Sequence, residues 1–373
     1  MSGVAAERAR AAGETVGDLV ERARVLVCGG AGGVGKTTTA AALGLEGARR
    51  GRKVCVVTID PARRLGDALG VRAAAGELVR VEEAGPGELW ALMLDAKATF
   101  DELVRRYATS EEQAESILRN RLYRNLSSSL SGTQEYMASE KLYELTEQHA
   151  FDLVVVDTPP ARHAVDFLEA PARLQRLLEN RIFRLLVLPT TTYLRAVSIG
   201  LRAFLRSVSS VVGTEVVDDV VAFFETFEGM EDGFRRRAAR VEALLREPST
   251  RFVLVTTPQA EAAAEAAWLA AELARAGFGI GATVVNRAQP RFLPPTLAAP
   301  EPESLDANWR PLIENLLELE ALASYEAGTL EALRAVSGTR CEVPLLPADV
   351  HDLDGLAVLS DYLSGRRRPN ELS

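Results

Sequence analysis

Residues 25–39 read VLVCGGAGGVGKTTT, and this stretch decides the fold. An apolar run typical of a buried strand leads into a glycine-rich loop, which ends at the start of an alanine-rich helix. Within the stretch, residues 30–37 have the GxxxxGKT spacing of a P-loop. Glycines let backbone N–H groups approach a phosphate closely, and the positive end of the following helix points at the same anion. The sequence therefore predicts a loop that binds the phosphates of a nucleotide.

Two side chains of the loop have predicted chemical roles. Lys36 is expected to reach the terminal phosphates and to assist their hydrolysis, and the Thr37 hydroxyl is expected to ligate Mg²⁺. A glycine-rich turn without a ligand is the alternative, and it fits less well because a strand precedes the loop and a helix follows it. The predicted nucleotide-binding residues of the loop are Gly30, Gly32, Gly33, Val34, Gly35, Lys36, Thr37 and Thr38.

Composition and charge narrow the class of protein. The chain has 373 residues, enough for one enlarged domain or about two, and its 47% apolar residues can form a sizeable core. The formal net charge of −9 argues against general nucleic-acid binding, which needs Lys and Arg to neutralise phosphates. No stretch resembles a secretory signal or a membrane-spanning helix, so we expect a cytoplasmic protein that reaches a membrane only through a partner.

The three cysteines lie far apart in the sequence. Cys28, Cys55 and Cys341 are each in or beside an apolar run, where cysteine behaves as a small buried hydrophobe. Because no CxxC pair occurs, we expect no zinc site. This cysteine usage is typical of a reducing cytosol.

Seven apolar runs predict the strands of one sheet. Their apolar character is near-continuous, which is typical of strands covered on both faces. Helical segments between them predict parallel crossovers, and hence an α/β fold with a doubly wound, mostly parallel sheet of the P-loop NTPase type. The predicted strands are 24–29, 53–59, 88–94, 152–157, 252–257, 282–286 and 341–346.

Two long and mostly helical stretches, 96–150 and 166–248, interrupt the series of strands. We expect these insertions to form a helical subdomain beside the sheet. The predicted organisation is then a helical N-terminal extension, 1–23, followed by one enlarged domain, 24–373, that carries the insertions.

The second insertion contains two apolar helix faces that need a cover. Full burial of such side chains contributes about 1.5–3 kcal/mol each, so these faces are not expected to lie in water. Three alternatives can cover these faces: other helices of the same chain, a second subunit or a bound apolar client. The residues of this possible hydrophobic groove are Val197, Leu201, Phe204, Leu205, Val208, Val220, Phe223, Phe224 and Phe227.

Polar residues that follow other predicted strands add to the site. Asp60 lies at the carboxyl end of a strand, where ligands of open α/β sheets bind, and is a candidate to orient the attacking water; a helix N-cap is the alternative. Asp157 ends an apolar strand in the Walker-B layout, in which the carboxylate holds Mg²⁺. His163 either positions water or packs as a structural residue. Asn286 ends a later strand, and its amide can donate to and accept from a purine edge.

In this order, these segments resemble the ArsA family of ATPases, which includes the arsenite-pump ATPase and the cytosolic ATPase that delivers tail-anchored membrane proteins. The resemblance extends from about residue 24 to about residue 363. The motifs that carry it are GGAGGVGKTTT (29–39), TIDPARRLGDAL (58–69), GTQEYMASEKLYEL (132–145), VVVDTPPARHAVDFL (154–168), VVNR (284–287) and CEVPLLPADVHDLDGL (341–356).

The resemblance implies a dimeric switch that binds ATP and Mg²⁺ and opens and closes its helical subdomain. It assigns water orientation to Asp60, adenine contact to Asn286 and closure over the base to Pro344. The first implied switch loop contains Asp60, Pro61, Ala62 and Arg63; the second contains Asp157, Thr158, Pro159 and His163.

The chain departs from the family pattern at Ala31, where the family carries a second P-loop lysine that crosses to the partner subunit. Either hydrolysis is slow, or another cation substitutes (Arg63, Arg64 and Arg162 are candidates), or a different chain donates its lysine in a heterodimer. The absence of CxxC speaks against a zinc-clamped homodimer, and the isolated cysteines speak against an arsenite site.

The function predicted from these residues is an ATP-hydrolysing switch whose helical subdomain binds a hydrophobic protein segment or a membrane-protein partner. One alternative is an ATPase subunit that energises an anion transporter in a membrane. Another is a slow regulatory switch that works as a heterodimer. A metabolic kinase is not favoured, because the sequence shows no acceptor site.

Overall fold

The computed structural model describes residues 14–59, 64–71, 74–121, 123–124, 133–149, 151–179, 229–293, 306 and 308–369. The chain divides into two compact units. The sheet unit consists of Met1–Met93, Glu144–Val165 and Arg246–Ser373, and the helical unit consists of Leu94–Tyr143 and Asp166–Leu245.

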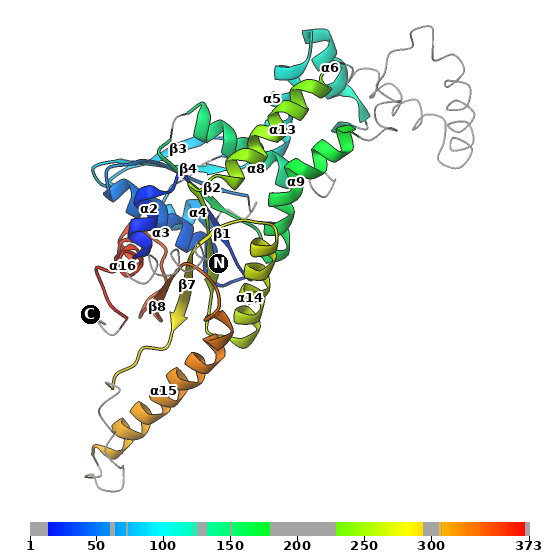
Figure 1. Ribbon diagram of the computed structural model, residues 1–373. Coiled ribbons are helices and arrows are strands. Elements are labelled where there is room, and N and C mark those ends of the chain that lie inside the picture. Colours follow the sequence, from blue (N-terminus) through cyan, green and yellow to red (C-terminus); the bar gives the residue numbers. More distant parts are fainter. Residues whose placement is uncertain are drawn as a thin grey trace. The chain divides into compact units, whose positions relative to one another are not determined.

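The sheet unit is built on one eight-stranded sheet with the strand order β3-β4-β2-β5-β1-β6-β7-β8. Figure 1 shows this sheet with α2 (Val16–Arg22), α3 (Lys36–Arg49) and α14 (Ala260–Arg275) beside it. All neighbouring strands pair in parallel except β3, which is antiparallel to β4. This architecture confirms the predicted α/β fold with a mostly parallel sheet. The strands are β1 (Val25–Gly29), β2 (Lys53–Thr58), β3 (Leu78–Val81), β4 (Glu88–Met93), β5 (Leu153–Asp157), β6 (Thr250–Thr256), β7 (Ile280–Ala288) and β8 (Thr339–Pro344).

The sequence did not predict β3. This edge strand has four residues, and only Val81 is fully buried. It therefore lacks the near-continuous apolar run by which the buried parallel strands are recognised. An antiparallel strand at the edge of a sheet is half-solvated and leaves a weaker pattern.

Helices cover both faces of the sheet, as a doubly wound fold requires. Val284 packs in one apolar cluster with residues of α3 and α16, whereas its neighbour Val285 packs in another with residues of α14 and η2. Successive strand residues point to opposite faces, so these two clusters lie on opposite sides of β7. The helices of this unit are α2 (Val16–Arg22), α3 (Lys36–Arg49), α4 (Arg64–Leu69), α14 (Ala260–Arg275), α15 (Arg310–Thr329), η2 (Leu330–Leu333) and α16 (Leu353–Leu363).

Helix α3 lies directly on the strands because two of its positions are glycine. A Cβ at Gly44 would lie 2.3 Å from Val56 Cγ2, and one at Gly47 would lie 2.8 Å from Val54 Cγ2. Such distances are not tolerated, so these glycines set the close approach of α3 to β2. This packing fixes the helix that begins at the end of the P-loop.

The C-terminal tail is tied to α3 by a basic side chain. Arg366 donates from Nη1 to Oε1 of Glu46 at 3.0 Å, and Glu46 is fully buried in α3. Glu46 also accepts from Arg50 and Ser360, at 2.8 and 2.7 Å. A buried carboxylate on the P-loop helix requires a cationic partner, and Arg366 and Arg50 supply this charge.

The helical unit has an apolar core of its own, which includes Leu103, Ile117, Met137 and Phe234. It contains α5 (Ala96–Tyr107) and α6 (Glu111–Arg119), and three helices extend from one unit's range into the other's. These are α8 (Thr133–Glu147), α9 (Ala161–Glu179) and α13 (Glu231–Arg246). Across the described residues, we find no helix with the length and hydropathy needed to span a bilayer.

Several sequence-based expectations fall outside the described residues. The nine residues of the possible hydrophobic groove, from Val197 to Phe227, all lie within 180–228, and much of the predicted N-terminal extension lies within 1–13. The proposed domain limits, 1–23 and 24–373 with insertions at 96–150 and 166–248, therefore stay a prediction.

Candidate functional site

The loop between β1 and α3 lies at the carboxyl edge of the sheet. Gly30 is needed because a Cβ there would lie 2.0 Å from the Val255 carbonyl oxygen on β6. Gly35 has a φ of 93° and forms the N-cap of α3. A Cβ at Gly32 or Gly33 would meet nothing within 4 Å, so the outer side of the loop is open to a ligand. The geometry fits a cradle of backbone amides for an anion.

Lys36 is folded back across this loop. Its side chain is buried, and Nζ donates to the Ala31 carbonyl oxygen at 2.7 Å. The ammonium group is thereby held over the loop, where the N-terminus of α3 adds its own positive potential. Ala31 contributes its backbone oxygen to this contact, and its methyl group cannot supply a second cation.

Asp157, at the carboxyl end of β5, contacts the first turn of α3 and the carboxyl end of β2. Its Oδ2 accepts a hydrogen bond from Thr37 Oγ1 at 2.8 Å and another from Thr58 Oγ1 at 2.9 Å. Parallel pairing explains the convergence, because the register places Asp157 opposite both Cys28 of β1 and Thr58 of β2. A threonine hydroxyl beside a carboxylate is a set of hard oxygen donors, which is the chemistry that Mg²⁺ prefers.

The second predicted switch loop begins as a fixed segment. Thr158 is buried, and its Oγ1 donates to the Cys28 carbonyl oxygen at 2.7 Å. Pro159 follows half-buried, and the backbone of His163 lies in α9. The side chains of His163 and Arg162 are outside the description, as are the side chain of Arg64 and all of Asp60, Pro61, Ala62 and Arg63. The predicted roles of these residues stay predictions.

Asn286 contacts the phosphate loop, a contact that the sequence did not predict. Its Nδ2 donates to the Val34 carbonyl oxygen at 2.9 Å, and its Oδ1 accepts from the Arg287 backbone N–H at 3.0 Å. The predicted contact of Asn286 with adenine stays a prediction. A strand ending in asparagine gives no sign of which loop its amide will reach.

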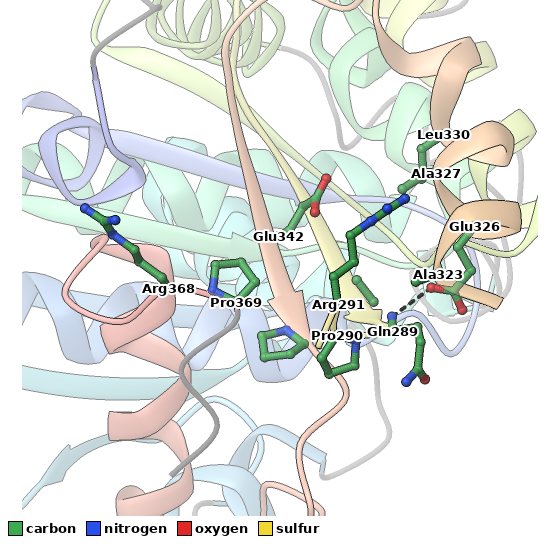
Figure 2. A pocket seen from close by; sticks show the side chains of 12 residues that line it. Gln289, Pro290, Arg291, Ala323, Glu326, Ala327, Leu330, Glu342, Arg368 and Pro369 are labelled. Carbon is green, nitrogen blue, oxygen red and sulfur yellow. Dashed lines mark hydrogen bonds between the residues drawn. The ribbon is translucent and has the colours of Figure 1, made fainter. Parts of the chain in front are cut away.

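Pro344 lines a pocket of about 500 Å³ at the ends of β7 and β8 (Figure 2). Pocket residues come from the segment after β7, from α15 and from the C-terminal tail. The Gln289 backbone N–H donates to Glu326 Oε2 at 2.7 Å, as the dashed line in Figure 2 shows. This hydrogen bond connects the segment after β7 to α15. No residue of the P-loop lines this pocket, which adjoins the residue predicted to close over the base.

Two cysteines of the sheet unit, Cys28 and Cys341, have raised pKa values. Burial raises the pKa of Cys28, and the nearby Asp157 carboxylate raises it further. Burial raises the pKa of Cys341 to about 12. Cys28 and Cys55 are buried as predicted, whereas Cys341 is partly exposed. Among the residues that the structure describes, no three His, Cys, Asp or Glu side chains gather as a metal site would need.

Comparison with known proteins shows the family of the chain. The model of the ArsA family, described as an anion-transporting ATPase, matches residues 23–294. The chain belongs to the ArsA family of ATPases. The matched segment of this family member includes the P-loop, Asp157 and Asn286, and ends before Pro344.

Relatives with a curated name include ATPases called GET3. The chain is 25% identical to ATPase GET3 of Malassezia globosa over 347 residues, which is 92% of either protein. It is 30% identical to ATPase get3 of Schizosaccharomyces japonicus over 166 residues, 44% of this chain and 49% of that protein. It is also 30% identical to ATPase get3 of Aspergillus niger over 159 residues, 42% of this chain and 45% of that protein.

Proposed function

We propose that this ArsA-family protein is an ATP-hydrolysing switch whose nucleotide state controls the helical unit. The observation that carries the proposal is the convergence of Thr37 and Thr58 on Asp157, directly beside the open loop held by Lys36. In this assignment Thr37 and Asp157 hold Mg²⁺, which neutralises charge on the phosphates. Lys36 and the loop amides bind the phosphates.

The switching residues complete the proposed cycle. Asp60 orients the attacking water, and the loop from Asp157 to His163 responds to the terminal phosphate. Asn286 and Pro344 bind the base. At Ala31 the chain lacks the second P-loop lysine, whose role would be comparable to that of an arginine finger. An arginine finger contributes about 10³–10⁵ in rate. We therefore expect slow turnover unless a partner chain supplies the charge.

The proposed client is a hydrophobic helical segment, taken up by the apolar faces of 196–213 and 215–230. A dimer, either of two copies or with a related ATPase, and a cytoplasmic location are parts of the same proposal. Support comes from the amphipathic pattern of these segments and from the likeness to the GET3 ATPases.

Phosphate release from Mg-ATP tests the enzymatic part. We expect slow but measurable release by the intact chain and loss of release in Asp157→Asn and Asp60→Asn. Asp354→Asn is the matched control, since Asp354 is an exposed carboxylate in the first turn of α16. Equal rates in all four proteins would contradict the assignment.

Capture of a fluorescent apolar helical peptide tests the client. We expect nucleotide-dependent capture that is lost when Phe223 and Phe224 are replaced by serine. A peptide bound equally well by that variant contradicts the proposed groove.

A second function is favoured by one observation, the description of the family model as an anion-transporting ATPase. In that case the protein energises a membrane transporter. Stimulation of phosphate release by an arsenite-like oxyanion would support it, and the wide separation of the three cysteines in the sequence argues against it.

A further inference from the structure

The amide of Asn286 reaches a peptide group of the phosphate loop. Nδ2 lies 2.9 Å from the Val34 carbonyl oxygen, and a Cβ on Gly35 would lie 2.4 Å from the same nitrogen. Asn286 is therefore packed against the one peptide that joins Val34 to Gly35. The absence of a side chain at Gly35 is what admits it.

The backbone that presents Asn286 is irregular. The register between β7 and β8 shifts between Val285 and Ala288, and Arg287 has a φ of 58°, which is uncommon for a residue with a side chain. The Arg287 N–H donates to Asn286 Oδ1 and fixes the orientation of the amide. Bulges beside functional sites re-aim a side chain, and strain of this kind persists where the surroundings enforce it.

The consequence follows from the planarity of the peptide. The Val34 C=O and the Gly35 N–H belong to one trans peptide and point in opposite directions. Holding the carbonyl toward Asn286 therefore fixes the direction of the Gly35 N–H, a donor at the N-cap of α3. Without that hold, a peptide followed by a glycine in the left-handed region can rotate at low energetic cost.

We propose that Asn286 is a positioning residue for the phosphate loop, which orients the Val34–Gly35 peptide so that its N–H is ready to bind phosphate. The inference rests on the proposed function, in which this loop binds Mg-ATP. It differs from a contact with the base, because the effect of Asn286 reaches any ligand with a triphosphate, with or without a nucleoside.

Inorganic tripolyphosphate with Mg²⁺ separates the two roles. We expect Asn286→Ala to weaken binding of Mg-tripolyphosphate about 5- to 10-fold, the value of one hydrogen bond. Binding of Mg-ATP should weaken by at least that factor, because ATP also loses the proposed contact with the base. Asn315→Ala is the matched control, since Asn315 is exposed on α15, and both affinities should be unchanged. Loss of ATP affinity with unchanged tripolyphosphate affinity would overturn the inference and leave a base contact.

Amide hydrogen exchange distinguishes positioning from a general loss of stability. In Asn286→Ala without ligand, we expect faster exchange confined to residues 30–38, with β6 and α16 unchanged. Faster exchange throughout the sheet unit would overturn the inference, because Asn286 would then stabilise the fold alone. An unaltered chain that binds neither ligand would instead overturn the proposed function, and this result is separate from any effect of the variants.

Discussion

At the scale of the residue, Asp157 shows how a buried carboxylate is made tolerable. It is 1% exposed, and two threonine hydroxyls donate to one of its oxygens. Charged groups are costly to bury unless hydrogen bonds compensate for lost hydration. One donor lies on α3 and the other on β2, so the carboxylate also fixes the positions of Thr37 and Thr58.

Removing one of these donors should destabilise the protein. We expect Thr58→Val to lower the free energy of unfolding by about 1–3 kcal/mol, because the buried acceptor loses a partner. Thr39→Val on α3 is the control: Thr39 is fully buried, and within the described structure its hydroxyl makes no hydrogen bond. Urea unfolding should show this control neutral or stabilised. A Thr39→Val protein as unstable as Thr58→Val would contradict the account.

At the scale of the element, charged pairs fasten helices to one another. Glu46 of α3 binds Arg366 of the tail and Ser360 of α16, and Glu140 of α8 binds Arg237 of α13 within the helical unit. Both carboxylates are almost fully buried. Each pair therefore ties together segments that are distant in the sequence.

The Glu46 cluster predicts a dependence of stability on pH. Burial alone would raise the pKa of Glu46, but hydrogen bonds from Arg366, Arg50 and Ser360 outweigh it and lower the pKa below the ordinary 4.5. A lowered folded-state pKa stabilises the protein above the ordinary value, and this stabilisation is lost as pH falls through the folded value. We expect Glu46→Gln to have a flatter acid limb in the free energy of unfolding measured against pH. Parallel acid limbs in the two proteins would show that Glu46 does not titrate as described.

The Glu140–Arg237 pair should be sensitive to the loss of either partner. Arg237 Nε lies 2.6 Å from Oε1 and 2.9 Å from Oε2 of Glu140, and its guanidinium stacks 3.8 Å from the Tyr143 ring centroid. We expect Glu140→Leu to cost about 3–5 kcal/mol of unfolding free energy, since it leaves a buried cation without its carboxylate. Adding Arg237→Met should restore most of that loss. A double variant at least as unstable as the single one would contradict this reading.

Local patterns in the sequence predicted the strands and helices well, but they did not predict the side-chain contacts between distant segments. Continuous apolar runs located seven strands, and the glycine spacing located the loop between β1 and α3. The contacts of Asn286 with Val34 and of Arg366 with Glu46 join residues 252 and 320 positions apart. The pattern within one segment cannot predict such contacts, because they form only when the folded sheet brings the two segments together. Antiparallel β3 was missed because its exposed residues weaken the apolar pattern.

At the scale of the whole molecule, the chain connections link the two units through the strands that flank the phosphate loop. Helix α8 leads into β5, α9 follows β5, and α13 leads into β6. β5 and β6 are the neighbours of β1 on either side. Asp157 is the last residue of β5, and α9 is the next element along the chain. A change at Asp157 can therefore act on a helix that continues into the helical unit.

Coupling between the units should be visible in hydrogen exchange. We expect Mg-ATP to slow exchange in residues 30–38 and also to alter exchange in α9 and α13, beyond the loop that contacts the ligand. Asp157→Asn should lose the distant change even at saturating nucleotide. A ligand effect confined to the sheet unit would contradict control of the helical unit by nucleotide.

Isothermal titration calorimetry with Mg-ATP tests the central claim most directly. Hydrogen bonds to charged groups contribute about 1.5–3 kcal/mol, so we expect saturable binding by the unaltered chain and an affinity about 10- to 100-fold lower in Lys36→Ala. Absence of binding by the unaltered chain, or equal affinity in the two proteins, would contradict the account.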